Sequence, residues 1–109
     1  MAQTHARSGQ VIALHPGSRA SAPARTTAIL KAEQLEVAHI VLAAGKTLPE
    51  HQVAGEITLL GLTGTIVLRT SEGEQLLGPG DFIHLRGGEP HALTARDDAT
   101  ALLTICLLA

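Results

Sequence analysis

The stretch "GPGDFIHLRGGEPH", from Gly78 to His91, places two glycine-rich turns around a short run of strand length. Glycine and proline at both turns are typical of tight reversals between antiparallel strands. The stretch ends on His91, which begins the next apolar run. A histidine that follows so tight a turn has two explanations. Its side chain points into a cavity or at a metal ion, or it is simply the first residue of the following strand.

The same alternation of short apolar runs and turn residues continues on both sides of this stretch. The runs span residues 27–31, 35–43, 56–62, 65–70, 74–77, 81–85, 91–95 and 100–108. Each has the length of a strand, and Gly, Pro and Asp residues separate them at close spacing. No segment shows a sustained helical period with capping residues. The pattern predicts an all-β protein, an antiparallel sandwich or barrel.

The composition is that of one ordinary domain with an aliphatic core. The chain has 109 residues, of which 45% are hydrophobic and 17% are charged. Phe82 is the only aromatic residue, which argues against base or sugar stacking on aromatic side chains. The net charge of −2 does not suit a polyanion binder, so we expect no nucleic-acid partner.

Basic residues are concentrated at the N-terminus. Four of them, Arg7, Arg19, Arg25 and Lys31, precede the first acidic residue, Glu33. We expect residues 1–25 to form a flexible basic arm and residues 26–109 to form the barrel domain. Such an arm is typical of a transit peptide or of an unstructured extension. Its one apolar patch, "QVIAL" (10–14), can pair as an added strand against a second subunit.

The single cysteine and the last apolar run indicate compartment and partners. Cys106 is alone, which excludes an intrachain disulfide and favours a buried thiol in a reducing cytoplasm. The run "ALLTICLL" (101–108) is too short to span a bilayer, so we expect no membrane partner. This run and "ITLLGL" (57–62) are apolar on both faces, whereas a strand with one wet face should alternate. We therefore expect a partner subunit to cover one face, in a homodimer.

Residues 45–91 resemble the cupin family of small RmlC-like jelly-roll β-barrels. The second cupin motif is a glycine, five residues, a proline, one residue, a glycine, two residues and a histidine. Here Gly80, Gly88 and His91 match it, with Arg86 in place of the proline and Ala95 where an asparagine is common. The resemblance covers residues 26–109 and implies an antiparallel jelly-roll β-barrel.

The first cupin motif is degenerate in this chain. It usually carries a glycine, five residues, a His-x-His pair, a glutamate and a closing glycine. Gly45 and His51 match, but Val53 occupies the position of the second histidine. The glutamate position falls at Glu56 or Ile57, depending on a gap of one residue. Such a shift along a strand moves a side chain to the opposite face.

The resemblance implies a divalent metal ion, Fe, Mn, Ni or Zn, held inside the barrel by His51 and His91 together with Glu56 or His84. Two histidines and one carboxylate form the minimal non-haem iron set. His84 lies on the same strand face as Phe82, so it is a ligand only if that face points inward and a surface residue otherwise. His39 is expected to be a strand histidine facing solvent or a partner. Arg86 either reaches an anionic ligand at the barrel mouth or lies in solvent.

Three functions fit this reading, because one barrel carries many activities. The first is a barrel that binds a divalent metal ion, a small molecule or both. The second is a metal-dependent enzyme of dioxygenase, isomerase or decarboxylase type acting on a small apolar substrate. The third is a degenerate, non-catalytic cupin kept for dimerisation. The sequence gives no substrate and identifies no catalytic residue.

Overall fold

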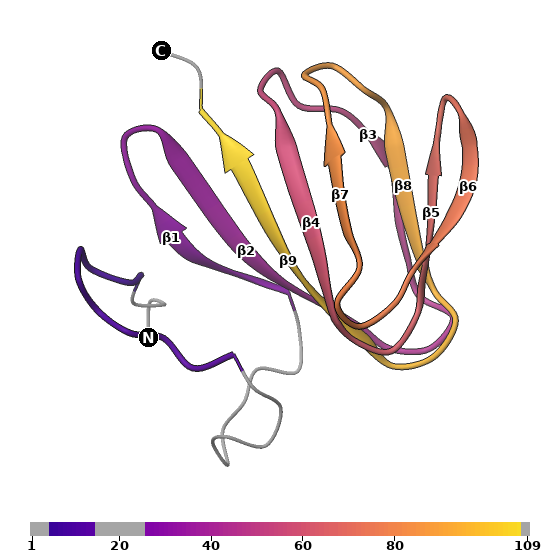
Figure 1. The fold of residues 1–109 in the computed structure, drawn as a ribbon, viewed down its shortest axis with the longest axis horizontal. Coiled ribbons are helices and arrows are strands. Elements are labelled where there is room, and N and C mark those ends of the chain that lie inside the picture. Colours follow the sequence, from indigo (N-terminus) through magenta and orange to yellow (C-terminus); the bar gives the residue numbers. More distant parts are fainter. Residues whose placement is uncertain (1–4, 15–25, 108–109) are drawn as a thin grey trace.

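The computed structural model describes residues 5–14 and 26–107, and within these residues it contains only strands, turns and loops (Figure 1). The strands are β1 (Thr27–Lys31), β2 (Leu35–Leu42), β3 (Thr47–His51), β4 (Ile57–Thr63), β5 (Ile66–Thr70), β6 (Gly73–Leu77), β7 (Phe82–Leu85), β8 (His91–Ala95) and β9 (Ala99–Cys106). All of their pairings are antiparallel. The predicted all-β fold, an antiparallel jelly-roll β-barrel, is confirmed.

The strands form two sheets that face each other. One sheet has the order β1-β2-β9-β4-β7 and the other the order β3-β8-β5-β6. Strands distant in sequence therefore become neighbours, since the last strand, β9, lies between β2 and β4. Figure 1 shows the two layers, with β7 and β6 each at an edge of its own sheet.

The hydrophobic core lies between the sheets and is aliphatic, as the composition predicts. In β8 the residues His91, Leu93 and Ala95 are buried, and the residues between them are half-buried. This alternation follows from the strand period, which sends successive side chains to opposite faces. The buried core cluster consists of Ile40, Leu42, Leu59, Ile66, Leu68, Leu77, Leu93, Ala95, Ala99 and Ala101.

At one end of the four-stranded sheet, the residues on the inner face are polar instead of aliphatic. In the register of this sheet, His91 is level with His51 on β3 and with Thr70 on β5. The next level inward is aliphatic, with Leu93 beside Leu48 and Leu68. The histidine level lies at the end of the sheet because Thr70 closes β5 and His91 opens β8.

One strand was not predicted. Each of the eight predicted runs overlaps one observed strand, but β3, "TLPEH", falls within a segment that the sequence indicated to be a break. Pro49 is the reason, because proline has no N–H to donate and is found in sheets mainly on edge strands. β3 is such an edge strand and pairs only with β8 among the described residues. It carries His51, so the missed strand is a part of the site.

The N-terminal segment contacts β1 where it is described. The main-chain N–H of Ala6 donates to the carbonyl of Ile29 at 2.7 Å. Val11, in the patch that was expected to pair with a second subunit, is 92% exposed. The rest of the predicted arm, residues 1–4 and 15–25, lies outside the described residues. The described part of the chain contains no helix that could span a membrane.

Candidate functional site

Two histidines lie side by side on the inner face of the barrel. His51 ends β3, His91 begins β8, and the two residues are direct cross-strand partners. The centroids of their rings are 4.3 Å apart, with an angle of 57° between the ring planes. His91 is only 4% exposed, whereas His51 is exposed to solvent. The pair therefore joins a buried imidazole to an accessible one.

Main-chain hydrogen bonds fix the same nitrogen in both rings. Nδ1 of His91 lies 2.9 Å from the carbonyl of Glu89, and Nδ1 of His51 lies 3.0 Å from the carbonyl of Pro49. A carbonyl only accepts, so each Nδ1 donates and carries the proton. In a neutral imidazole the lone pair is then on Nε2. This is the arrangement in which histidine binds metal ions, with the second nitrogen held by a main-chain carbonyl.

The double glycine of the opening stretch brings the two histidine-bearing segments together. The N–H of Gly88 donates to the carbonyl of Val53 at 2.7 Å, and Gly88 has a φ of +78°, in the left-handed region that favours glycine. A Cβ on Gly87 would lie 2.2 Å from the carbonyl oxygen of Ala54. The turn before His91 therefore packs directly on the segment that follows His51, at a distance that only glycine allows.

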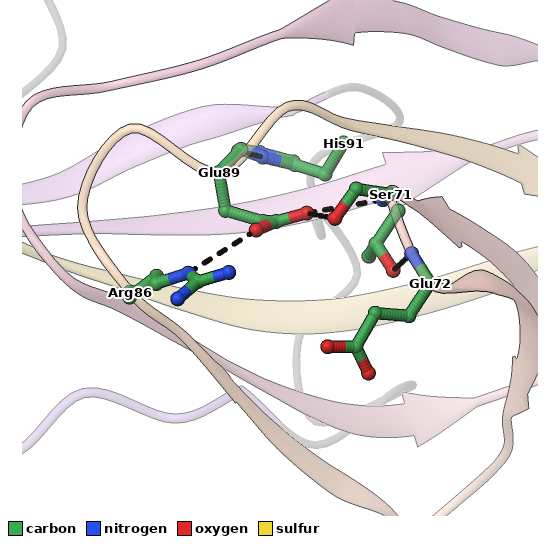
Figure 2. Close-up of polar contacts among 6 residues, drawn as sticks. Ser71, Glu72, Arg86, Glu89 and His91 are labelled. Carbon is green, nitrogen blue, oxygen red and sulfur yellow. Dashed lines mark hydrogen bonds and ion pairs between the residues drawn. The ribbon is translucent and has the colours of Figure 1, made fainter.

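A half-buried carboxylate anchors the same turn (Figure 2). One oxygen of Glu89 accepts from the N–H of Ser71 at 3.0 Å and is 2.5 Å from its hydroxyl. The other oxygen is 3.5 Å from Nε of Arg86, and the Glu89 side chain is 9% exposed. The hydrogen bonds from Ser71, followed by Arg86, hold the pKa of Glu89 below its ordinary value. Glu89 therefore stays ionised and ties the β7–β8 turn to the β5–β6 turn.

A cavity of about 410 Å³ opens at this end of the barrel, within the size range of small-molecule sites. Its lining consists of Thr70, Glu72, Gln75, Ile83, His84, Leu85, Arg86 and Glu89. A second hollow of about 320 Å³ shares Gln75 and Ile83 with it. Neither His51 nor His91 is in this lining, but Thr70, which is, is the cross-strand neighbour of His91. Its lining is more polar than the sequence predicted, and Arg86 is at its rim.

His84 and Glu56 do not join this pair. Nε2 of His84 lies 2.6 Å from a carboxylate oxygen of Glu56, and both side chains are more than half exposed. On β7 the residues that face the core are Ile83 and Leu85, so the face shared by His84 and Phe82 points outward. Of the two positions that the sequence left open for His84, the structure shows the surface one, and Glu56 pairs with it there.

The structure thus brings together two of the four predicted ligands. Within residues 5–14 and 26–107, no three side chains of His, Cys, Asp or Glu converge as a metal-binding group. Cys106 is half-buried rather than fully buried, and its neighbours in the register place it on the outer face of the larger sheet. The role of Glu89 was missed by the sequence analysis, although its position two residues before His91 within the motif was visible.

His39 is a buried histidine outside the site. It is 8% exposed, and its Nε2 has no hydrogen-bond partner in the described structure. Burial lowers its pKa, because desolvation disfavours the charged ring. Its cross-strand neighbours, Thr27 and Leu102, carry no charge that opposes this effect. His39 is thus buried by its own chain, although the sequence predicted that it faces solvent or a partner.

Acidification is expected to destabilise the protein through His39. At pH values below the ordinary histidine pKa of about 6.5, His39 binds a proton in the unfolded chain but stays neutral in the folded chain. The free energy of unfolding therefore falls as the pH is lowered. The fall ends at the lowered pKa of the folded state. Urea unfolding at a series of pH values between about 8 and 5 measures it. His39→Leu should show a shallower fall than the wild type, and equal slopes for the two proteins would contradict the prediction.

The fold and the histidine pair together define the class of protein: a jelly-roll β-barrel with paired imidazoles near an open cavity at one end. The family profile described as "Cupin domain" matches residues 38–107, more than half of the chain. The chain therefore belongs to the cupin family. A search of curated protein sequences finds no match.

Solved structures of low sequence identity share the fold. A cupin superfamily protein from Desulfitobacterium hafniense is 18% identical, with a TM-score of 0.73 and 76% of each chain covered. A conserved protein of unknown function from Streptococcus pyogenes is 20% identical, with a TM-score of 0.72, covering 77% of this chain and 74% of its own. A DMSP lyase from Ruegeria pomeroyi is 23% identical, with a TM-score of 0.70, over 75% of this chain but 46% of its own.

Proposed function

We propose that this cupin binds a divalent metal ion through Nε2 of His51 and His91 and a small molecule in the nearby cavity. The observation that carries the proposal is the matched pair of Nδ1–carbonyl hydrogen bonds, which leaves both Nε2 atoms as free acceptors. The donor set of two neutral imidazoles suits Fe, Mn, Ni or Zn.

Among the described residues two side chains serve as ligands to such an ion, so water or the bound molecule fills the remaining positions. A metal ion held in this way supplies Lewis acidity to a coordinated oxygen. The residues of this chain bind and orient the molecule. Thr70 and Gln75 offer hydrogen bonds, Arg86 offers a positive charge at the rim, and Ile83 and Leu85 offer apolar contact.

Metal and ligand titrations of the untagged protein test this proposal. We expect saturable binding of Zn²⁺ or Ni²⁺ by calorimetry at one ion per chain, and a rise in melting temperature with added metal. Small carboxylates, sugars and phenols are then screened with and without the ion. Stabilisation by a small molecule only in the presence of metal supports the enzyme-type alternative, and stabilisation without metal supports a binding protein. No binding of either kind would favour a non-catalytic cupin kept for dimerisation.

A second proposal concerns the outer face of the five-stranded sheet, which we infer is covered by a second copy of this chain. In the register, Phe82, Leu60 and Leu102 form one row across β7, β4 and β9. Phe82 is 63% exposed and Leu35, at the other end of the same face, is 43% exposed. Phe82 is the only phenylalanine, tyrosine or tryptophan of the chain, and its exposure beside Leu60 and Leu102 suits a symmetric dimer interface.

Light scattering coupled to size exclusion tests the dimer. We expect the wild type to elute as a dimer and Phe82→Glu to elute as a monomer. The control is Leu76→Glu, which changes a residue that is 58% exposed on the other sheet and should leave the dimer intact. A monomeric wild type, or a dimeric Phe82→Glu, would overturn this interface. We also infer a reducing, cytoplasmic location, because a lone cysteine cannot form an intrachain disulfide.

A further inference from the structure

We propose that Glu89 is a positioning residue for His91: its carboxylate fixes the β7–β8 turn on the β5–β6 turn, so that its main-chain carbonyl holds the imidazole with Nε2 facing the barrel interior. The inference deepens the proposed function, on which its metal-binding arm rests. It assigns a task to a half-buried carboxylate that does not itself bind the ion.

The side chain of Glu89 holds the β7–β8 turn on the β5–β6 turn. Its carboxylate accepts two hydrogen bonds from Ser71, at 3.0 Å from the main-chain nitrogen and 2.5 Å from the hydroxyl. Ser71 directly follows Thr70, which is level with His91 in the sheet. Figure 2 shows the carboxylate lying between Ser71 and Arg86, which come from two different turns. The anchor is therefore attached beside the strand that neighbours His91.

The main-chain carbonyl of Glu89 orients the imidazole of His91. Its carbonyl accepts the proton of His91 Nδ1 at 2.9 Å. Side chain and carbonyl belong to one residue, so fixing the first restricts the rotation of the second. The preceding residues, Gly87 and Gly88, have more backbone conformational freedom than any other residue type. The hydrogen bond that closes this turn, from the N–H of Glu89 to the carbonyl of Arg86, is long at 3.2 Å. The carboxylate therefore adds a second restraint to the hydrogen bond that Gly88 makes with the carbonyl of Val53.

The interaction with Arg86 adds little to this arrangement. The Arg86 side chain is 77% exposed and its Nε is 3.5 Å from the Glu89 carboxylate, and exposed ion pairs of this kind contribute little to stability. The contact with Ser71 is the one that matters, because its two hydrogen bonds, at 3.0 and 2.5 Å, are shorter than the contact with Arg86. A residue that merely stabilised the turn would change the melting temperature and leave the His91 tautomer as it is.

Nitrogen-15 NMR of the imidazole rings in the metal-free protein separates these two roles. At a pH of about 8, where histidine is neutral, we expect His91 in the wild type to be protonated on Nδ1 alone. In Glu89→Ala we expect a mixture of both tautomers. Glu89→Gln keeps an acceptor oxygen for Ser71, so we expect it to retain the wild-type tautomer. The matched control is Glu74→Ala, which removes an exposed acidic side chain that pairs with Arg69 outside the cavity lining and should leave the His91 tautomer unchanged.

Titration with Zn²⁺ gives the second readout. Loss of a group that orients a metal-binding histidine typically costs 10- to 100-fold in metal affinity, so Glu89→Ala should bind about 10-fold more weakly or worse. An unchanged His91 tautomer in Glu89→Ala overturns the inference, whatever happens to the melting temperature. If the wild type binds no metal while Glu89→Ala still mixes the tautomers, the proposed function fails and the positioning role stands. Should Glu89→Ala not fold, Glu89→Met is the test, because it keeps the length of the side chain but cannot accept either hydrogen bond from Ser71; a mixture of tautomers supports the inference and the wild-type tautomer overturns it.

Discussion

Replacing either His51 or His91 by alanine is expected to remove the metal affinity of this protein. Each variant leaves a single imidazole, and one protein ligand cannot hold a divalent ion against water. We expect a loss greater than the roughly 10- to 100-fold that follows from losing an outer-shell partner. Calorimetric titration with Zn²⁺ and metal analysis of the purified variants measure it. His91→Ala should also lower the melting temperature, because His91 is 4% exposed and packed.

The control for this experiment is another histidine of the same chain. His84→Ala removes an imidazole that is hydrogen-bonded to Glu56 on the outer face, so the affinity for Zn²⁺ should equal that of the wild type. If His51→Ala and His91→Ala retain their metal content, the paired site does not exist. If His84→Ala loses it, the ion binds on the outer surface instead.

Gly87→Ala is expected to have the largest effect on stability among the small substitutions in the turn before His91. The new Cβ would lie 2.2 Å from the carbonyl oxygen of Ala54, which is main chain and cannot rotate away. Relief requires the turn to separate from the segment after His51, at a cost of about 1–3 kcal/mol or more for forced overpacking. The separation also moves His91 from His51. Urea unfolding and Zn²⁺ titration of the same sample measure both effects.

Gly78→Ala is the matched control for this substitution. A Cβ at Gly78 meets only a carboxylate oxygen of Asp81 at 3.5 Å, an ordinary contact, and Gly78 is not among the residues with positive φ. We expect a change in the free energy of unfolding of less than about 1 kcal/mol. Equal stabilities of the two glycine variants would show that the contact of Gly87 with Ala54 is not tight in solution.

Much of the fold could be predicted from the sequence because it depends on short-range signals. Alternation of apolar residues and glycine-rich turns determined eight of the nine strands, and these signals act over a few residues. β3 could not be predicted in this way, since Pro49 signals a break. Only its place at the edge of a sheet, which the whole topology decides, makes a strand with a proline acceptable.

Two of the four proposed ligands of the site could be predicted for a similar reason. The motif spacing gave His51 and His91, and the register placed them opposite each other. The faces of His84 and Glu56 depend on strand register, in which a shift of one residue reverses the direction of a side chain. The sequence alone left that choice open for both residues. The hydrogen bond between Glu89 and Ser71 joins two turns 18 positions apart in the sequence. No local sequence pattern predicts such a contact.

The edge position of β3 has a consequence for how an ion would come and go. β3 is joined to the rest of the barrel only through β8 among the described residues, and its register is irregular between Leu48 and His51. His91 belongs to a strand with neighbours on both sides. Fraying of one short strand therefore frees one of the two imidazoles while the barrel stays folded. We expect the amides of β3 to exchange with solvent faster than those of β8, and bound metal to slow that exchange.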